Sequence, residues 1–197
     1  MNRRPEACRM RRRSAHGGAA QANRNGALSP DGGRFYRIWL PPRPGIFVLP
    51  ELYCVDVASK QVLKSIPMHG SGPLAVSPDG ATAYVAGLDV NSVAPVLLIV
   101  DLATSQLAHV SFPGAYLALS ADGARLYGTY QPELDEVAVM DTATLGISAI
   151  PLPAPAGPLA LSSDGTRLYA AYTAFQSRIA VIDTAAKQVI SSLPLSA

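Results

Sequence analysis

Aspartate is the residue type whose spacing could most readily support chemistry in this 197-residue chain. Recurrent carboxylates can act as paired acids and bases. Eight of the fourteen acidic residues recur at two fixed positions, Asp31, Asp79, Asp122 and Asp164 at the first and Asp56, Asp101, Asp141 and Asp183 at the second. The first position always lies in Ser-x-Asp-Gly and the second in Asp-x-Ala. Asp bonds nearby backbone amides and Gly accepts a positive φ, so these are turn sequences. We therefore predict a structural role in turns for all eight.

Histidine and cysteine show no metal-binding spacing. His16, His69 and His109 are far apart, and no Cys-x-x-Cys or His-x-x-x-His sequence occurs. Cys8 and Cys54 form no disulfide framework, and we expect Cys54 to be a small core hydrophobe. Nucleophile-elbow, phosphate-loop and dinucleotide fingerprints are absent from the sequence. We predict no catalytic residue, no metal site and no cofactor, which favours a non-enzymatic role.

The two aspartate positions belong to one long repeat. The first recurs after 48, 43 and 42 residues and the second after 45, 40 and 42 residues. The first motif extends over ten residues, as in Ala160–Tyr169, and ends in Tyr36, Tyr84, Tyr127 or Tyr169. A fixed period in this range indicates stacked supersecondary units. We expect these tyrosines, with Tyr130 and Tyr172, to be packing residues.

Each repeat divides into four short strands. In the fourth copy we expect them at residues 158–162, 167–172, 178–183 and 188–194. Strands such as Val96–Val100 and Ile179–Ile182 are almost continuously apolar, which is typical of strands buried on both faces. Four-stranded antiparallel units covered on both sides predict an all-β fold, the β-propeller, with an all-β solenoid as the lesser alternative. We place the blades at about residues 26–68, 72–112, 115–153 and 157–195.

The motif Ala160–Tyr169, followed by Val181–Ala185 and Val189–Pro194, resembles the YVTN-type propeller repeat. Such repeats occur in surface-layer-like proteins, and similar blades occur in methylamine dehydrogenase-like heavy chains and lactonase-like propellers. The resemblance covers residues 26–195 and implies the fold. For function it implies either a binding scaffold or, as the alternative, the propeller subunit of a quinone-dependent amine dehydrogenase-like enzyme or a lactonase-like hydrolase. It also implies export to the periplasm or beyond.

Four recognisable blades are fewer than the seven or so usual in this family. We therefore expect a partial propeller, which leaves apolar faces bare on the first and last blades. Such faces would favour association, for example as a homodimer that completes the ring. The alternative is that the chain is a piece of a longer exported propeller.

Antiparallel strand order assigns the connecting segments to two ends of the blades. The aspartate turns share one end, here called the turn face. The segments joining second to third strands, and one blade to the next, share the other end, here called the loop face. Variable loops on a rigid scaffold usually carry recognition. We predict that a protein or small ligand contacts Arg43, Asp89, Asn91, Glu133, Asp135, Gln176 and Arg178.

The first 25 residues differ from the rest in charge. They contain seven arginines against the single acid Glu6, whereas the later residues have nine basic and thirteen acidic side chains. We expect this basic segment to be disordered. It has no aromatic residues between its arginines, so we predict no nucleic-acid binding. It also lacks the apolar core of an export signal, and no apolar stretch of the chain is long enough to span a bilayer.

Overall fold

The computed structural model describes residues 26–39, 49–88, 94–130 and 134–195. These residues form sixteen strands in four antiparallel sheets, each with its strands in sequence order. Sheet 1 contains β1 (Ala27–Leu28), β2 (Arg34–Trp39), β3 (Glu51–Asp56) and β4 (Val62–Pro67). Sheet 2 contains β5 (Leu74–Val76), β6 (Thr82–Leu88), β7 (Pro95–Asp101) and β8 (Leu107–Ser111). Sheet 3 contains β9 (Tyr116–Leu119), β10 (Arg125–Thr129), β11 (Glu136–Asp141) and β12 (Ile147–Pro151). Sheet 4 contains β13 (Ala156–Leu161), β14 (Arg167–Thr173), β15 (Ser177–Asp183) and β16 (Gln188–Pro194).

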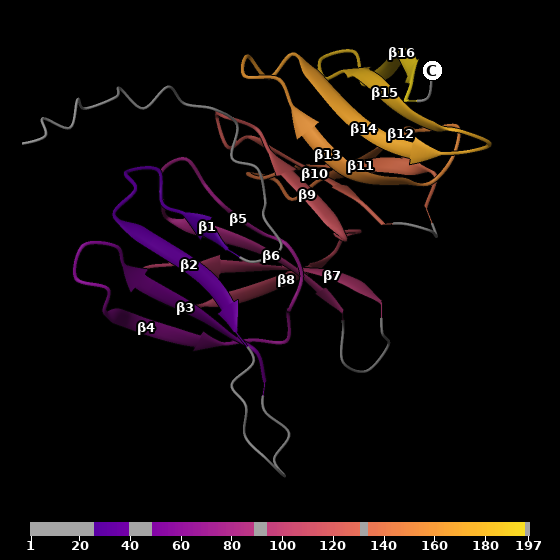
Figure 1. Cartoon of the computed structure of the whole chain (residues 1–197). Coiled ribbons are helices and arrows are strands. Elements are labelled where there is room, and N and C mark those ends of the chain that lie inside the picture. The colour runs from indigo at the N-terminus through magenta and orange to yellow at the C-terminus, as the bar shows by residue number, and fades with distance from the viewer. Residues whose placement is uncertain (1–25, 40–48, 89–93, 131–133, 196–197) are drawn as a thin grey trace, which may run out of the picture.

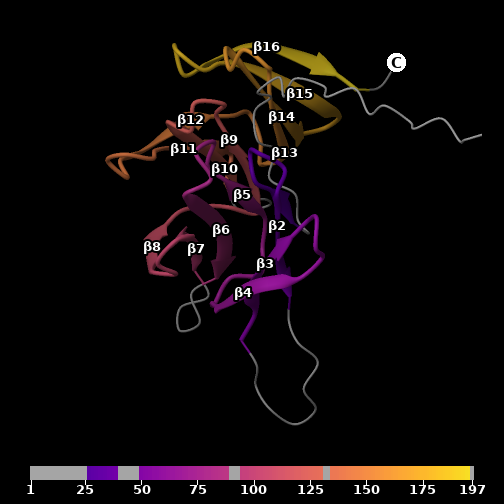
Figure 2. The same ribbon diagram turned by 90° about the vertical axis from the view of Figure 1, so that its left-hand side faces the viewer.

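The sheets follow one another in chain order, with sheets 1 and 4 at opposite ends of the arrangement (Figures 1 and 2). The first strand of each sheet contacts the first strand of the next, β1 with β5, β5 with β9 and β9 with β13. The first strands therefore lie innermost and the fourth strands outermost. The four expected strands of the last repeat are confirmed to within two residues at each end.

Three apolar clusters fill the spaces between successive sheets. Tyr36 lies between sheets 1 and 2, Tyr84 between sheets 2 and 3, and Tyr127 between sheets 3 and 4. All three are at most 5% exposed, so their expected packing role is confirmed. Each cluster joins the tyrosine-bearing face of one sheet to the opposite face of the next. Cys54 is a free, buried member of the first cluster, as expected.

Tyr169 corrects the expectation that all four recurrent tyrosines pack. It occupies the same position in sheet 4, yet its exposed fraction is 36%. Tyr169 pairs with Val181 and shares with it the face of sheet 4 that no further sheet of the described chain covers. The motif places the side chain on that face, but burial needs a following sheet.

The outer face of sheet 1 is the second face that no sheet of the described residues covers. Phe35 pairs with Val55, and Arg37 pairs with Tyr53, so all four side chains lie on the face opposite Tyr36. Trp39, on the same face, is 42% exposed. The expectation of bare apolar faces on the first and last sheets is therefore confirmed.

Candidate ligand-binding site on the loop face

A pocket of about 360 Å³ lies on the loop face, where the chain enters β5 and β9. Because β5 and β9 are inner strands, the pocket lies near the centre of the arc, between sheets 2 and 3. Its lining comprises His69, Ser71, Gly72, Pro73, Ala86, Gly87, Leu88, Gly114, Ala115 and Tyr130. A concave site of this volume, with apolar walls and a few polar groups, is typical of small-ligand binding.

Glycines let the connecting segments pack closely on β6 and so shape the pocket. The Gly72 amide donates to the Ala86 carbonyl and the Ala86 amide donates to the Pro73 carbonyl, both at 2.9 Å. A Cβ on Gly72 would lie 2.8 Å from the Ala86 carbonyl oxygen, and one on Gly114 would lie 2.8 Å from the Ala86 Cβ. The segments that enter β5 and β9 therefore both pack against Ala86 of β6.

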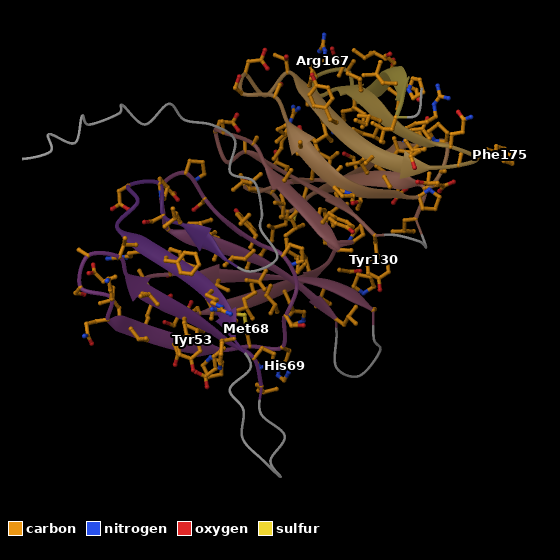
Figure 3. All side chains as sticks on the ribbon, viewed as in Figure 1. Tyr53, Met68, His69, Tyr130, Arg167 and Phe175 are labelled. Carbon is orange, nitrogen blue, oxygen red and sulfur yellow. The ribbon has the colours of Figure 1, made fainter. Side chains whose placement is uncertain are left out.

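Three polar side chains line this pocket. His69 follows the buried Met68 and is exposed, whereas Tyr130 directly follows β10 and is half-buried (Figure 3). Ser71 lies two residues beyond His69 and is also exposed. An imidazole and two hydroxyls can donate and accept hydrogen bonds, while Pro73 and Leu88 supply apolar contact. This set can orient a small polar ligand, or a side chain of a partner protein, against an apolar wall.

The predicted contact residues divide into two groups. Arg43, Asp89, Asn91 and Glu133 lie outside the described residues. Asp135 precedes β11 and Gln176 lies between β14 and β15, both exposed on the loop face. Neither these two nor Arg178 is among the residues that line the pocket. Their predicted contact with a ligand remains a proposal.

Arg178 has partners within its own sheet. Its Nε donates to the Ser192 Oγ at 2.8 Å, and that Oγ also lies 2.6 Å from the Tyr172 hydroxyl. Arg178 pairs directly with Tyr172 and lies on the face of sheet 4 that packs against sheet 3. These contacts hold the guanidinium against β16 at the loop end of the sheet.

Sequence reasoning missed the described pocket residues His69, Ser71 and Tyr130. The repeat pattern predicts a packing role for Tyr130, and His69 has no metal-binding spacing that would single it out. The available signal was local: His69 begins the run His-Gly-Ser-Gly, the most glycine-rich of the segments that join one repeat to the next. Glycines there indicate close backbone approach, which commonly borders a cavity.

The turn face confirms the structural role of the recurrent aspartates. In sheet 4, Asp164 Oδ1 accepts hydrogen bonds from the Ser162 hydroxyl at 2.6 Å and the Thr166 amide at 3.0 Å. These bonds lower the pKa of Asp164 to about 2. In the other turn of that sheet, Asp183 Oδ1 accepts from the Ala185 and Ala186 amides at 3.0 and 2.9 Å.

The same bonds recur at the other six positions and lower the pKa of each carboxyl through hydrogen bonding. Within the described ranges, His, Cys, Asp and Glu form no group of three that could hold a metal ion. A helix long and apolar enough to cross a membrane is also absent from those ranges.

The stacked sheets, innermost first strands and repeated turns define a β-propeller fold, here an open arc of four blades. The predicted fold class is thus confirmed. Sheets 1 to 4 are blades 1 to 4 from here on. No protein-family model matches the sequence, and no curated protein matches it significantly.

Solved structures resemble the chain in fold. Hydrazine synthase from Kuenenia stuttgartiensis matches with a TM-score of 0.70 at 20% identity, over 89% of this chain and 50% of that one. TolB from Acinetobacter baumannii matches with a TM-score of 0.65 at 22% identity, over 88% and 43%. The Cps50 (Swd1) β-propeller domain from Myceliophteria thermophila matches with a TM-score of 0.67 at 14% identity, over 91% and 56%. This chain therefore spans about half the length of the structures it resembles.

Proposed function

We propose that this chain is a non-catalytic binding scaffold of YVTN-type repeats that presents its loop face to a protein or a small ligand. The pocket between blades 2 and 3 is the observation that carries the proposal. It lies near the centre of the arc, where segments from two blades and the ends of β6 and β10 meet. His69 and Ser71 come from the segment that enters blade 2, and Tyr130 follows β10 of blade 3, so a ligand there contacts both blades at once.

The chemistry of the pocket favours binding over turnover. Among the described residues, its lining contains a histidine and two hydroxyls but no carboxylate, lysine or arginine. A histidine that acts as a general base normally has an orienting partner, such as a carboxylate, within hydrogen-bond reach. The described lining supplies no carboxylate for His69. The alternative, an amine dehydrogenase-like subunit or a lactonase-like hydrolase, has no comparable observation in its favour.

A ligand screen by protein-observed NMR tests the proposal. The ¹⁵N-labelled full chain is mixed with a library of small fragments and short peptides. We expect the amide signals of Gly72, Gly87 and Gly114 to shift together for the compounds that bind. Hits that shift residues on the turn face, or a screen without any hit, would contradict the proposal.

A matched pair of substitutions controls this screen. Ala115→Trp fills the pocket, because Ala115 is a half-buried part of its lining. Ala103→Trp makes the same change at an exposed position in the aspartate turn of blade 2, on the turn face. Binding is expected to be lost in the first variant and retained in the second.

A further inference from the structure

We propose that the exposed face of blade 4 packs against the exposed face of blade 1 of a second copy of this chain, and that two such contacts close a ring of eight blades. This interface is separate from the ligand pocket and goes beyond the binding function. It follows from what the three internal interfaces share and from what the two end faces carry.

Every internal interface joins the same two kinds of face. The tyrosine-bearing face of one blade packs against the opposite face of the next, as with Tyr127 of blade 3 against Leu161 and Leu168 of blade 4. The two uncovered faces are one of each kind. Blade 4 exposes its tyrosine-bearing face, and blade 1 exposes the face that would receive it. A second copy therefore supplies the missing partner for both ends.

A cation crosses two of the internal interfaces to the same backbone position. The Arg125 guanidinium of blade 3 donates to the Thr184 carbonyl of blade 4 at 2.9 Å. The Lys64 ammonium of blade 1 donates to the Leu102 carbonyl of blade 2. Thr184 and Leu102 each directly follow the second recurrent aspartate of their repeat. This carbonyl is thus the recurrent acceptor at the boundary between blades.

Arg167 is the counterpart of Arg125 in blade 4. Its guanidinium donates to the Thr166 carbonyl at 2.9 Å and to Asp183 Oδ2 at 2.7 Å, both within blade 4, and its side chain is 37% exposed. Figure 3 shows it at the opposite end of β14 from Phe175. The matching acceptor position in blade 1 is Val57, which follows Asp56 and is 44% exposed. Docking of two copies would bring Arg167 to the Val57 carbonyl.

The side chains on the two end faces also suit such a contact. The blade 1 face has a hollow of about 350 Å³ lined by Phe35, Arg37, Trp39, Tyr53 and Val55. Arg37 lies over the Trp39 ring, 5.0 Å from its centroid, at one side of the hollow. The blade 4 face carries Tyr169 at its centre, beside Val181 and Ile179. An aromatic knob facing an aromatic-lined hollow is the arrangement that interface hot spots favour.

Head-to-tail contacts of this kind either close into rings or continue as filaments. The chain covers 43–56% of the length of the structures it resembles, so two copies together have about the length of one such chain. We therefore expect dimers, in which two copies of the chain close one ring.

Light scattering during size-exclusion chromatography of the full chain tests the proposal. We expect a discrete species of twice 20.6 kDa. Tyr169→Arg and Val55→Arg each place a charge on one end face and should raise the dissociation constant by about 30-fold or more. Ile147→Arg is the matched control, because Ile147 is 48% exposed on the outer part of blade 3 and lies on neither end face. Circular dichroism and a cooperative thermal transition confirm that each variant is folded.

Mixing the two end-face variants identifies the pairing. Tyr169→Arg retains a native blade 1 face, and Val55→Arg retains a native blade 4 face. A mixture of the two should therefore form dimers that neither forms alone. A monomeric wild type, a series of larger polymers, or end-face variants that stay dimeric on their own would overturn the proposal.

Discussion

The Arg125 guanidinium donates a hydrogen bond to the Thr184 carbonyl at 2.9 Å and so links blade 3 to blade 4. Both residues occupy recurrent positions of the repeat, but this contact exists because two blades are stacked. Arg125→Gln removes the charged donor from a half-buried site and should lower the free energy of unfolding by about 1 kcal/mol. Urea denaturation measures the loss. A stability equal to wild type would show that the contact does not hold the blades together.

Gly128 lies where blade 3 meets the segment entering it. A Cβ at this position would overlap the Pro113 carbonyl oxygen and lie 2.5 Å from the Phe112 ring. Because the backbone of Pro113 cannot move easily, Gly128→Ala should lower the free energy of unfolding by about 3 kcal/mol. Gly165 has φ +71° and open space around it, so Gly165→Ala should cost about 1 kcal/mol from backbone strain alone. Equal losses in the two variants would contradict the packing described.

Leu145 adopts a left-handed conformation, with φ 58°, in the turn between β11 and β12 of blade 3. Leucine is strained there and glycine is not, so Leu145→Gly should raise the free energy of unfolding by about 0.5 kcal/mol despite its larger unfolded-state entropy. Leu107→Gly makes the same change in strand β8, at an exposed position without a positive φ, and should lower it. Thermal melting compares the two. Destabilisation by both changes would refute the assigned turn geometry.

Asp164 should contribute a pH-dependent part of the stability. Its pKa is lowered from 3.8 to about 2 by hydrogen bonds from Ser162 and Thr166. A carboxyl whose pKa falls on folding stabilises the fold above its unfolded pKa and loses that effect as the pH falls through the folded value. Asp164→Asn should therefore have a lower urea midpoint than wild type at pH 7, and the gap should narrow between pH 4 and pH 2. A gap that stays constant across this range would argue against the prediction.

The sequence predicts the repeat, the strands and the aspartate turns well because these depend on local chemistry. Ser162, Asp164 and Gly165 lie within four residues, and the hydrogen bonds among them join only residues of this turn. The motif alone does not predict the exposure of Tyr169, although the expected bare face on the last blade accounts for it. Its motif is the same as that of Tyr127, but its burial depends on how many blades follow it.

The pocket was equally hard to predict, for a different reason. Its walls are mostly glycine, alanine and proline, residue types without a chemical signature. His69 and Tyr130 are 61 positions apart in the numbering, and only the stacking of blades 2 and 3 brings their segments to one cavity. The predicted contact residues were chosen for charge and loop position. Those among them that the structure describes do not line this cavity.

The dissociation constant of the strongest fragment from the NMR screen tests the binding-scaffold proposal most directly. Isothermal titration calorimetry gives this constant for wild type, Tyr130→Ala and Phe175→Ala. Tyr130 lines the pocket, whereas Phe175 is fully exposed on the loop face of blade 4 and outside it. Loss of the Tyr130 ring and hydroxyl should weaken binding about tenfold or more, and the Phe175 change should leave it unaltered. Equal affinity for wild type and Tyr130→Ala would contradict a ligand site between blades 2 and 3.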